Sequence, residues 1–177
     1  AALDTLRSTQ GIAHINIGAA GTSMRFLTAY AAQLPGKECV ISGTERMHDR
    51  PIHELVNVLR ELGAEILYTH KEGYPPLHII GKRLGGGRTS VNADISSQFV
   101  SALLMIAPAF EEGLHLELKG DITSAPYIKM TLDMMQASGI AYDIENEGRI
   151  IFIPPQSYNS HTFNISADWS SASYRSE

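Results

Sequence analysis

Three short stretches place two neighbouring hydroxyl side chains directly after an apolar, strand-like segment, at 22–23, 96–97 and 170–171. Each fits the start of a helix, where unpaired backbone N–H groups and a partial positive charge favour anions. Serine and threonine there either cap the helix or donate to a ligand, and capping is the commoner role of a single hydroxyl. Because the pattern recurs, and because Gly21 leaves room for a ligand to approach the backbone, we expect an anion-binding site.

A second group of polar side chains lies in the turn SGTERMHDRPI, which carries Arg46 and Arg50. A guanidinium group suits a carboxylate or a phosphate, and the alternative is pairing with the acidic residues of the same turn. The corresponding later turn, KGDITSAPYI, has no arginine and offers Ser124 and Tyr127. This asymmetry predicts two different ligand moieties, and the residues together predict a small ligand with several negative charges.

A sequence repeat positions these residues. Ala20, Asp94 and Asp168 occupy the same place in three similar stretches and follow one another at intervals of 74 residues. Hydrophobic periodicity predicts strand, helix, strand, helix and two further strands in each full copy, at 14–81 and 89–155. We therefore expect an α/β fold of βαβαββ units. The period exceeds the roughly 20 to 50 residues of solenoid repeats, so the units should pack around a pseudo-symmetry axis.

The second helix of each copy is the clearest single element. Residues 51–63 and 126–139 carry apolar side chains at helical spacing, and both segments end in glycine, which favours the end of a helix. The second helix also contains Met130, Met134 and Met135. We expect these methionines to fill the core.

The repeats also define the expected domain organisation. Residues 1–160 are predicted to form a substrate-binding domain in which the glycine-rich segment 81–88 links the two copies. Residues 161–177 include FNISADWSSASY, which matches the first strand and helix start of a further copy. We therefore expect the sequence to stop inside a further repeat that leads toward a second domain.

Composition excludes several functional classes. The chain has 177 residues, of which 44% are hydrophobic and 19% are charged, and its net charge is −5. It contains no apolar run near the roughly 18 residues that span a bilayer and no cluster of basic residues, so we expect neither a membrane nor a nucleic-acid partner. Its seven histidines show no metal-binding spacing, and we predict no metal site. The single cysteine, Cys39, is expected to be buried in a strand and favours a cytoplasmic location.

Five ordered segments resemble motifs of the 5-enolpyruvylshikimate-3-phosphate synthase family. They are GAAGTSMRFL, GTERMHDRPIHELVNVLRELGA, DISSQFVSALLM, SAPYIKMTLDMM and DWSSASY. The resemblance covers nearly the whole chain from His14 onward. It implies transfer of the enolpyruvyl group of phosphoenolpyruvate to the 5-hydroxyl of shikimate 3-phosphate, with release of phosphate and without a metal or an organic cofactor. It also implies a monomeric parent protein.

The resemblance assigns roles to particular residues. Those expected to contact phosphoenolpyruvate are Gly21, Arg46 and Gln98. Those expected to hold shikimate 3-phosphate are Ser96, Ser97, Gln98 and Ser124. Further residues in the same motifs are Arg25, Arg50 and Tyr127.

The chain departs from the family pattern at two positions and lacks some of its motifs. Ala19 stands where the family usually has asparagine, and Phe26 stands where proline is frequent, but neither change removes a charge. The resemblance places the acid and base groups upstream of Ala1 and beyond Glu177. We therefore expect no catalytic residue in this chain and no turnover by the chain alone.

Three alternatives remain open at this point. The first is the related enolpyruvyl transferase that acts on UDP-N-acetylglucosamine, whose corresponding loop carries a cysteine; here 43–46 has none, and Cys39 lies upstream. The second is a non-catalytic anion-binding module of the same fold. The third is a purely structural repeat protein, in which the corresponding turns of the two copies should be interchangeable. The difference between Arg46 and Ser124 argues against it.

Overall fold

Two mixed sheets with the same arrangement of strands flank a layer of helices in this computed structural model, which describes residues 2–92, 96–120, 122 and 125–163. The strands of the first sheet are β1 (Ile12–Asn16), β2 (Glu38–Ser42), β3 (Glu65–Tyr68) and β4 (Leu77–Ile80). Those of the second are β5 (Gly87–Asn92), β6 (Leu114–Lys119), β7 (Asp143–Glu145) and β8 (Ile150–Ile153). The helices are α1 (Ala2–Ser8), α2 (Gly21–Ala32), α3 (Glu45–His48), α4 (His53–Glu61), α5 (Ser97–Ile106) and α6 (Ala125–Ala137), with 3₁₀ turns at Ala107–Ala109 and Asn146–Gly148.

The two sheets share one topology. Their orders are β1-β2-β4-β3 and β5-β6-β8-β7. In each, the first two strands are parallel, and the strand that ends the repeat lies antiparallel between its two neighbours. The parallel pairs β1–β2 and β5–β6 are joined through α2 and α5, as a parallel connection requires. The predicted α/β fold of repeated βαβαββ units is therefore confirmed.

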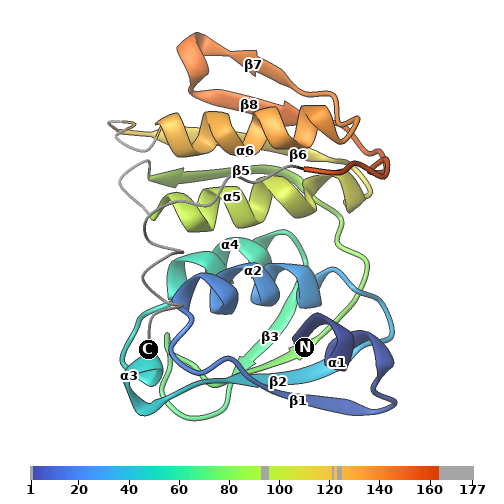
Figure 1. Ribbon diagram of the computed structural model, residues 1–177. Coiled ribbons are helices and arrows are strands. Elements are labelled where there is room, and N and C mark those ends of the chain that lie inside the picture. The colour runs from blue at the N-terminus through green and yellow to red at the C-terminus, as the bar shows by residue number, and fades with distance from the viewer. Residues whose placement is uncertain (1, 93–95, 121, 123–124, 164–177) are drawn as a thin grey trace, which may run out of the picture.

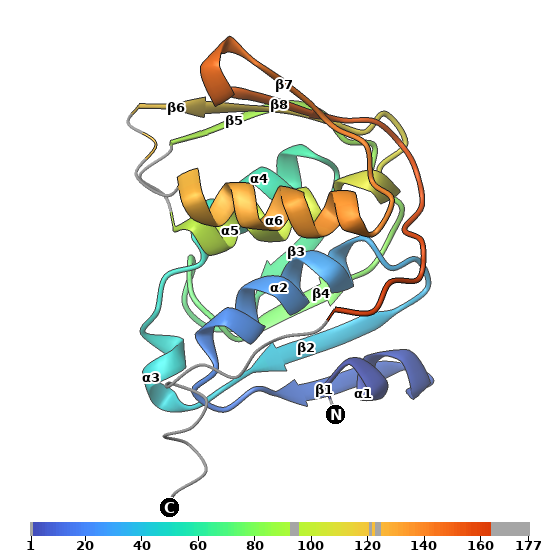
Figure 2. The same ribbon diagram turned by 45° about the horizontal axis from the view of Figure 1, so that its top comes forward.

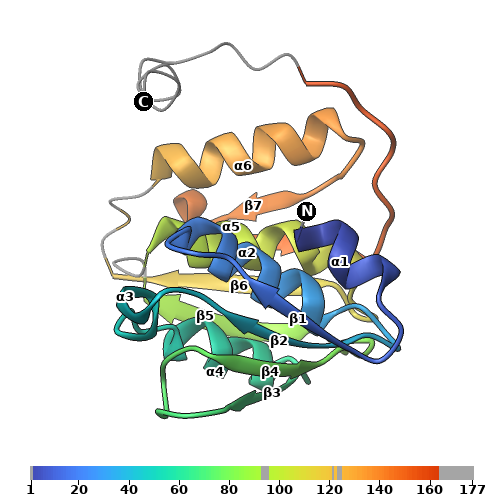
Figure 3. The same ribbon diagram turned by 60° about the horizontal axis from the view of Figure 1, so that its bottom comes forward.

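The helices lie between the sheets. Figure 1 shows α2, α4, α5 and α6 enclosed by the first sheet below and the second sheet above, and Figure 2 shows the same layers from a tilted view. Helices α2 and α5 pack side by side, and Figure 3 shows α1 beside β1 at the edge of the first sheet. Helices α2 and α5 begin at the same end of the molecule, so their first residues are brought together.

The repeats differ most in the connection from their second strand to their second helix. Residues 43–52 join β2 to α4, whereas the shorter segment 120–124 joins β6 to α6. The first connection contains α3, which the sequence did not predict because four residues are too few to show a helical period. The spacing between α2 and α5 is 76 positions, as their paired residues Thr22 and Gln98 show, against 74 in the sequence match.

Most of the predicted core positions are buried. The helix α4 buries Leu55, Val56 and Leu59, and Cys39 is buried in β2. Burial raises the pKa of the Cys39 thiol to about 11, so it behaves as a small apolar side chain at neutral pH. Strand β5 begins at Gly87, two residues before the predicted start of the second copy at residue 89. Strand propensity disfavours glycine, but the pairing of Gly87 with Leu114 of β6 places it in the strand.

The prediction for the methionines of α6 is wrong for two of the three. Met135 is buried as expected, but Met130 and Met134 are 53% and 42% exposed. Residues four apart share a helix face, so these two lie together on one side of α6. They line an open hollow with Phe163, and no described residue buries them.

Candidate functional site

The starts of α2 and α5 meet, and a hydrogen bond joins them. The side chain Nε2 of Gln98 donates to Thr22 Oγ1 at 3.0 Å, between residues that hold the same position in their two helices. The first residues of these two helices, far apart in the sequence, therefore lie side by side. They include Gly21, Ser97 and Gln98.

The hydroxyl groups at these helix starts do not cap the helices. The N-cap of α2 is Ala20 and that of α5 is Ser96, and neither has a side-chain capping hydrogen bond among the described residues. Ser96 is exposed, and Ser97 is half-buried. The capping role considered for the sequence is thus not what these residues do here, and their hydroxyls remain free to donate to a ligand.

Gly21 brings two arginines close to the first turn of α2. A methyl group built on this glycine would lie 2.7 Å from Arg50 Cζ and 2.8 Å from Arg25 Nη1, closer than side chains tolerate. The guanidinium groups of both arginines therefore occupy the space that a side chain at position 21 would need. Sequence reasoning placed a ligand against Gly21 but did not foresee that Arg50 would lie there first.

Arg25 is a nearly buried cation with incomplete hydrogen bonding. It is 8% exposed, and its Nη1 donates to the backbone oxygen of Gly21 at 2.8 Å. The Cζ atom of Arg25 lies 5.2 Å from the centroid of the Phe99 ring, but the Nε atom of Arg25 has no hydrogen-bond partner among the described residues. Burial, and secondly the charge of Arg50, lower the pKa of Arg25. The fold thus holds positive charge at some cost beside the start of α2.

The turn that carries Arg46 is tied to the loop before α2. Thr44 N donates to Gly18 O at 3.0 Å, and Ser42 Oγ lies 3.0 Å from His48 Nε2, which closes the turn on itself. Arg46 and Arg50 are both exposed, and in the part of the chain that the structure describes neither forms an ion pair with an acidic neighbour. The alternative of internal pairing is therefore not observed in the described part of the chain, and both guanidinium groups are exposed to solvent, that of Arg50 beside Gly21.

The arginines line two small polar hollows. One, of about 340 Å³, lies among Ala19, Thr44, Arg46 and Arg50. The other, of about 350 Å³, is lined by Arg25, Asp49, Arg50, Pro51, Glu54, Ser96 and Phe99. Each is large enough to admit a small anionic group, and Arg50 contributes to both.

The remaining predicted residues lie in a third, less polar hollow or outside the described residues. Ser97, Gln98 and Tyr127 line a hollow of about 530 Å³. Tyr127 is 60% exposed at the start of α6. Ser124 lies outside the described residues. Arg50 lines both arginine hollows, Ser96 lines the second of them, and Ser97 and Tyr127 line the third hollow.

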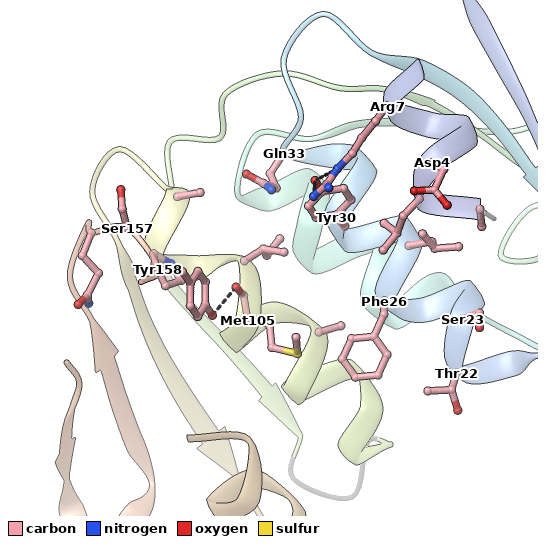
Figure 4. Close-up of a pocket in the computed structure, with 18 residues that line it drawn as sticks. Asp4, Arg7, Thr22, Ser23, Phe26, Tyr30, Gln33, Met105, Ser157 and Tyr158 are labelled. Atoms are coloured by element: carbon pink, nitrogen blue, oxygen red, sulfur yellow. Dashed lines mark hydrogen bonds between the residues drawn. The ribbon is translucent and has the colours of Figure 1, made fainter. Parts of the chain in front are cut away.

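A larger apolar groove adjoins this region, and the sequence did not reveal it. It measures about 1010 Å³ and runs between α1 and α2 on one side and α5 with the segment 156–158 on the other. Figure 4 shows Phe26 and Met105 facing the groove, Arg7 bound to the Tyr30 hydroxyl, and Tyr158 donating to the Met105 carbonyl oxygen. Burial raises the pKa of Tyr158 to about 12, so its hydroxyl stays a donor at neutral pH. One signal in the sequence could have indicated this groove: Phe26, which stands where the resembling family often has proline, lines it.

Metal and membrane sites find no support in the observed geometry. Among residues 2–92, 96–120, 122 and 125–163, no three His, Cys, Asp or Glu side chains gather as a metal site would require. No helix in the described part of the chain has the length and apolar character needed to cross a membrane. The prediction of a metal-free site stays a prediction.

Comparisons with known proteins agree on one family. The family model for EPSP synthase (3-phosphoshikimate 1-carboxyvinyltransferase) matches residues 5–175. The 3-phosphoshikimate 1-carboxyvinyltransferase of Bacteroides fragilis (strain YCH46) is 49% identical over 166 residues, which are 94% of this chain and 40% of that protein. The enzyme of the same name from Pasteurella multocida (strain Pm70) is 44% identical over 164 residues, 89% of this chain and 37% of that protein. The chain thus spans about 40% of the length of these relatives.

A solved structure supports the same grouping. EPSP synthase from Acinetobacter baumannii matches with a TM-score of 0.67 and 26% sequence identity. The match covers 81% of this chain and 31% of that protein. The fold described above is therefore similar to that of a segment of the Acinetobacter baumannii protein.

Proposed function

The chain belongs to the EPSP synthase family, and on that premise we propose that it forms part of the substrate site for enolpyruvyl transfer from phosphoenolpyruvate to shikimate 3-phosphate. The observation that carries the proposal is the meeting of the α2 and α5 starts beside three arginines. Both substrates are small and carry several negative charges, which suits helix starts and guanidinium groups. The resemblance read from five sequence motifs is confirmed at the level of the family.

The proposed reaction is an addition followed by an elimination. The 5-hydroxyl oxygen of shikimate 3-phosphate bonds to C2 of phosphoenolpyruvate, the hydroxyl proton leaves to a base, and the methylene carbon gains a proton. In the tetrahedral intermediate, the bond between C2 and the phosphate oxygen then breaks. Phosphate departs with the bonding pair, and the methyl group loses a proton to restore the double bond. This sequence uses neither a metal ion nor an organic cofactor.

We assign residues of the first repeat to phosphoenolpyruvate. Gly21 is assigned together with Arg50, whose guanidinium group lies where a side chain of Gly21 would be, and with the exposed Arg46 of the adjacent turn. A carboxylate or phosphate accepts paired hydrogen bonds from such groups, which would fix the orientation of the small substrate. Arg25 adds charge behind them.

Residues of the second repeat are assigned to shikimate 3-phosphate. Ser96 and Ser97 carry hydroxyl groups at the start of α5, where the N-cap Ser96 forms no side-chain capping hydrogen bond within the described part of the chain. Ser124 and Tyr127 belong to the following turn and helix. Gln98 lies between the repeats through its hydrogen bond to Thr22 and is assigned to both substrates. This division reproduces the asymmetry of the two turns: cations in the first copy and hydroxyls in the second.

The proposal extends to the behaviour of the chain by itself. We expect binding without turnover, because the acid and base groups expected for both proton transfers are not among the residues assigned above. We further propose a monomer in the cytoplasm, without nucleic-acid or membrane partners. The net charge of −5 and the buried, unpaired Cys39 support that part of the proposal.

The test is an amide NMR titration of the isotope-labelled chain with shikimate 3-phosphate, and with UDP-N-acetylglucosamine as the comparison ligand. Saturable shifts at Ser96, Ser97 and Gln98 with the first ligand alone are expected. Ser97→Ala should weaken them on the order of tenfold, the effect of one hydrogen bond to a charged group. Ser23→Ala is the matched control, since Ser23 lies in the first turn of α2 but lines the apolar groove.

Two results would overturn the proposal. Shifts with UDP-N-acetylglucosamine and none with shikimate 3-phosphate would favour the related transferase. Equal weakening by Ser23→Ala and Ser97→Ala would remove the assignment of residues to the second repeat. Separately, phosphate release from both substrates by the purified chain would contradict the expectation of binding without turnover.

A further inference from the structure

The four-residue helix α3 carries Arg46 but is too short to be stable on its own. Isolated helices of fewer than about 12 residues are marginal in water. Its N-cap residue, Thr44, makes no side-chain capping hydrogen bond among the described residues. Arg46 is exposed and forms no ion pair in the described part of the chain. The position of its guanidinium group therefore depends on the contacts that fix the backbone of α3.

The first part of α3 is fixed by backbone contacts and by one buried side chain. Thr44 N donates to Gly18 O at 3.0 Å, which joins the entry of α3 to the loop before α2. A methyl group built on Gly43 would lie 2.5 Å from Gly18 O and 2.9 Å from Met47 Cβ, so the two segments pack closely. Met47 is only 2% exposed. None of these contacts involves the side chain of His48, the last residue of the helix.

The end of α3 is held by His48 itself. This residue is half-buried, and its Nε2 lies 3.0 Å from Ser42 Oγ. An imidazole nitrogen and a hydroxyl group can each donate or accept, so the hydrogen bond forms in either neutral tautomer of the histidine. In the part of the chain that the structure describes, no other side chain of α3 forms a hydrogen bond.

The partner of His48 is part of the first sheet. Ser42 ends β2, where it pairs with Asn16 of the parallel strand β1, and its backbone oxygen accepts from Ile17 N at 3.0 Å. Core strands are among the last parts of a protein to open, so Ser42 is a rigid anchor. His48 thus connects the end of α3 to the sheet that also carries the loop before α2.

We propose that His48, through its hydrogen bond to Ser42, is a positioning residue that fixes Arg46 for its anionic ligand. His48 lines neither of the two arginine hollows, so it acts through α3 and not by touching the ligand. A guanidinium group binds a carboxylate or a phosphate through two parallel hydrogen bonds, which require a fixed orientation. The identity of the ligand as phosphoenolpyruvate rests on the proposed function, whereas the positioning role rests on the contacts of α3.

The experiment compares variants of the 177-residue chain in an NMR titration with phosphoenolpyruvate, followed by backbone amide and arginine Nε–Hε signals. We expect His48→Ala and Ser42→Ala each to weaken binding about threefold to tenfold, the factor that corresponds to one neutral hydrogen bond. Because both changes remove the same hydrogen bond, the double variant should bind no more weakly than either single variant. If His48→Ala does not fold, Ser42→Ala takes its place.

A rescue variant separates positioning from a general effect on stability. His48→Gln keeps an amide group that can bond to Ser42, so its affinity should stay within about twofold of the wild type. Alanine is a better helix former than histidine, so a loss in His48→Ala does not come from helix propensity. In the absence of ligand, ¹⁵N relaxation at Arg46 Nε and at the α3 amides should report greater motion in His48→Ala but not in His48→Gln.

The matched control is His70→Ala. Thr69 Oγ1 lies 3.1 Å from His70 Nδ1, so this variant also removes a hydrogen bond between a histidine and a hydroxyl group. His70 lies in the connection between β3 and β4 and lines neither arginine hollow. The control should leave both the affinity and the motion of Arg46 unchanged.

The proposal is overturned if His48→Ala leaves the relaxation of Arg46 and of α3 unchanged, or if His48→Gln behaves like His48→Ala. Losses that add in the double variant overturn it as well, because His48 and Ser42 would then act separately. Its failure is distinguishable from failure of the proposed function. Greater motion of Arg46 in His48→Ala, in a chain that does not respond to phosphoenolpyruvate, keeps the positioning role and removes the ligand. Unchanged binding and motion in His48→Ala keep the function and remove the positioning role.

Discussion

The same position in the two repeats holds a satisfied hydroxyl in one and an unsatisfied cation in the other. Arg25 of α2 and Ser101 of α5 are separated by the same 76 positions as Thr22 and Gln98. Ser101 Oγ lies 2.7 Å from Thr131 Oγ1, which in turn donates to a backbone oxygen, so this buried polar pair is complete. Arg25 has no such partner for its Nε. The second repeat therefore forms the same fold without a charge at this position.

The connections after the second strands show the same division. The first repeat uses the longer segment 43–52, whose helix α3 carries Arg46, and the second uses 120–124. A longer connection can present side chains that the sheet and helices do not dictate. The first repeat therefore presents Arg46 on a segment that has no counterpart of the same length in the second repeat.

The largest expected effect tests whether the repeats share one core. Ile79 in β4 and Ile151 in β8 are both buried, and replacing either with alanine should lower the free energy of unfolding by about 2–5 kcal/mol. Because α2 packs on α5, urea unfolding followed by circular dichroism should stay a single transition in both variants. Labelling of buried Cys39 gives a second probe, confined to the first repeat. Two separate transitions would show that the repeats are independent units.

A smaller change in the free energy of unfolding, of opposite sign, tests the cost of burying the charge of Arg25. Arg25→Met keeps much of the side-chain volume and removes the buried cation, so it should raise the free energy of unfolding by about 1–2 kcal/mol. Ser101→Ala, the matched change in the second repeat, should lower it by about 0.5–1.5 kcal/mol, since it breaks a satisfied hydrogen bond. Thermal or urea unfolding of both variants provides the measurement. A loss of stability in Arg25→Met would mean that the arginine is structural.

Gly21→Ala should displace a side chain without disturbing the fold. The added methyl group would collide with Arg50, which must move away from Arg25. We expect the affinity for phosphoenolpyruvate, followed by backbone amide shifts in an NMR titration, to fall about tenfold, because the Arg50 guanidinium group no longer lies beside the start of α2. Gly85→Ala is the control, since its new methyl group meets open space. Unchanged affinity in Gly21→Ala, measured by the same NMR titration, would show that Arg50 binds from its displaced position.

The smallest effect concerns the link between the repeats. A double-mutant cycle of Thr22→Val and Gln98→Ala should give a coupling free energy of about 0.5–1 kcal/mol, because the hydrogen bond they form is exposed. Urea unfolding of the wild type, both single variants and the double variant measures it. Strict additivity would mean that the two helix starts are held together by their packing alone.

Much of the fold was predictable because its signals are local. The apolar spacing of Leu55, Val56 and Leu59 follows the period of a helix, and the repeated order of elements fixed the βαβαββ topology. The errors have local causes too. The helices α1 and α3 are short, and Met130 and Met134 were assigned to a core that reaches only the other face of α6. Periodicity shows that a face is apolar, but it does not show what covers it.

The sequence by itself determined the repeat, the α/β topology, the family and the residue types of the candidate site. It also placed Gly21, Arg46 and Ser96 at the ends of elements, because turns and helix starts have composition signals of their own. Tertiary structure alone decided that Arg25 and Arg50 share one hollow, that Gln98 reaches Thr22, and that the hydroxyls do not cap their helices. These facts depend on contacts between segments distant in the chain, and no spacing within one segment encodes the electrostatics of two cations that meet across a fold.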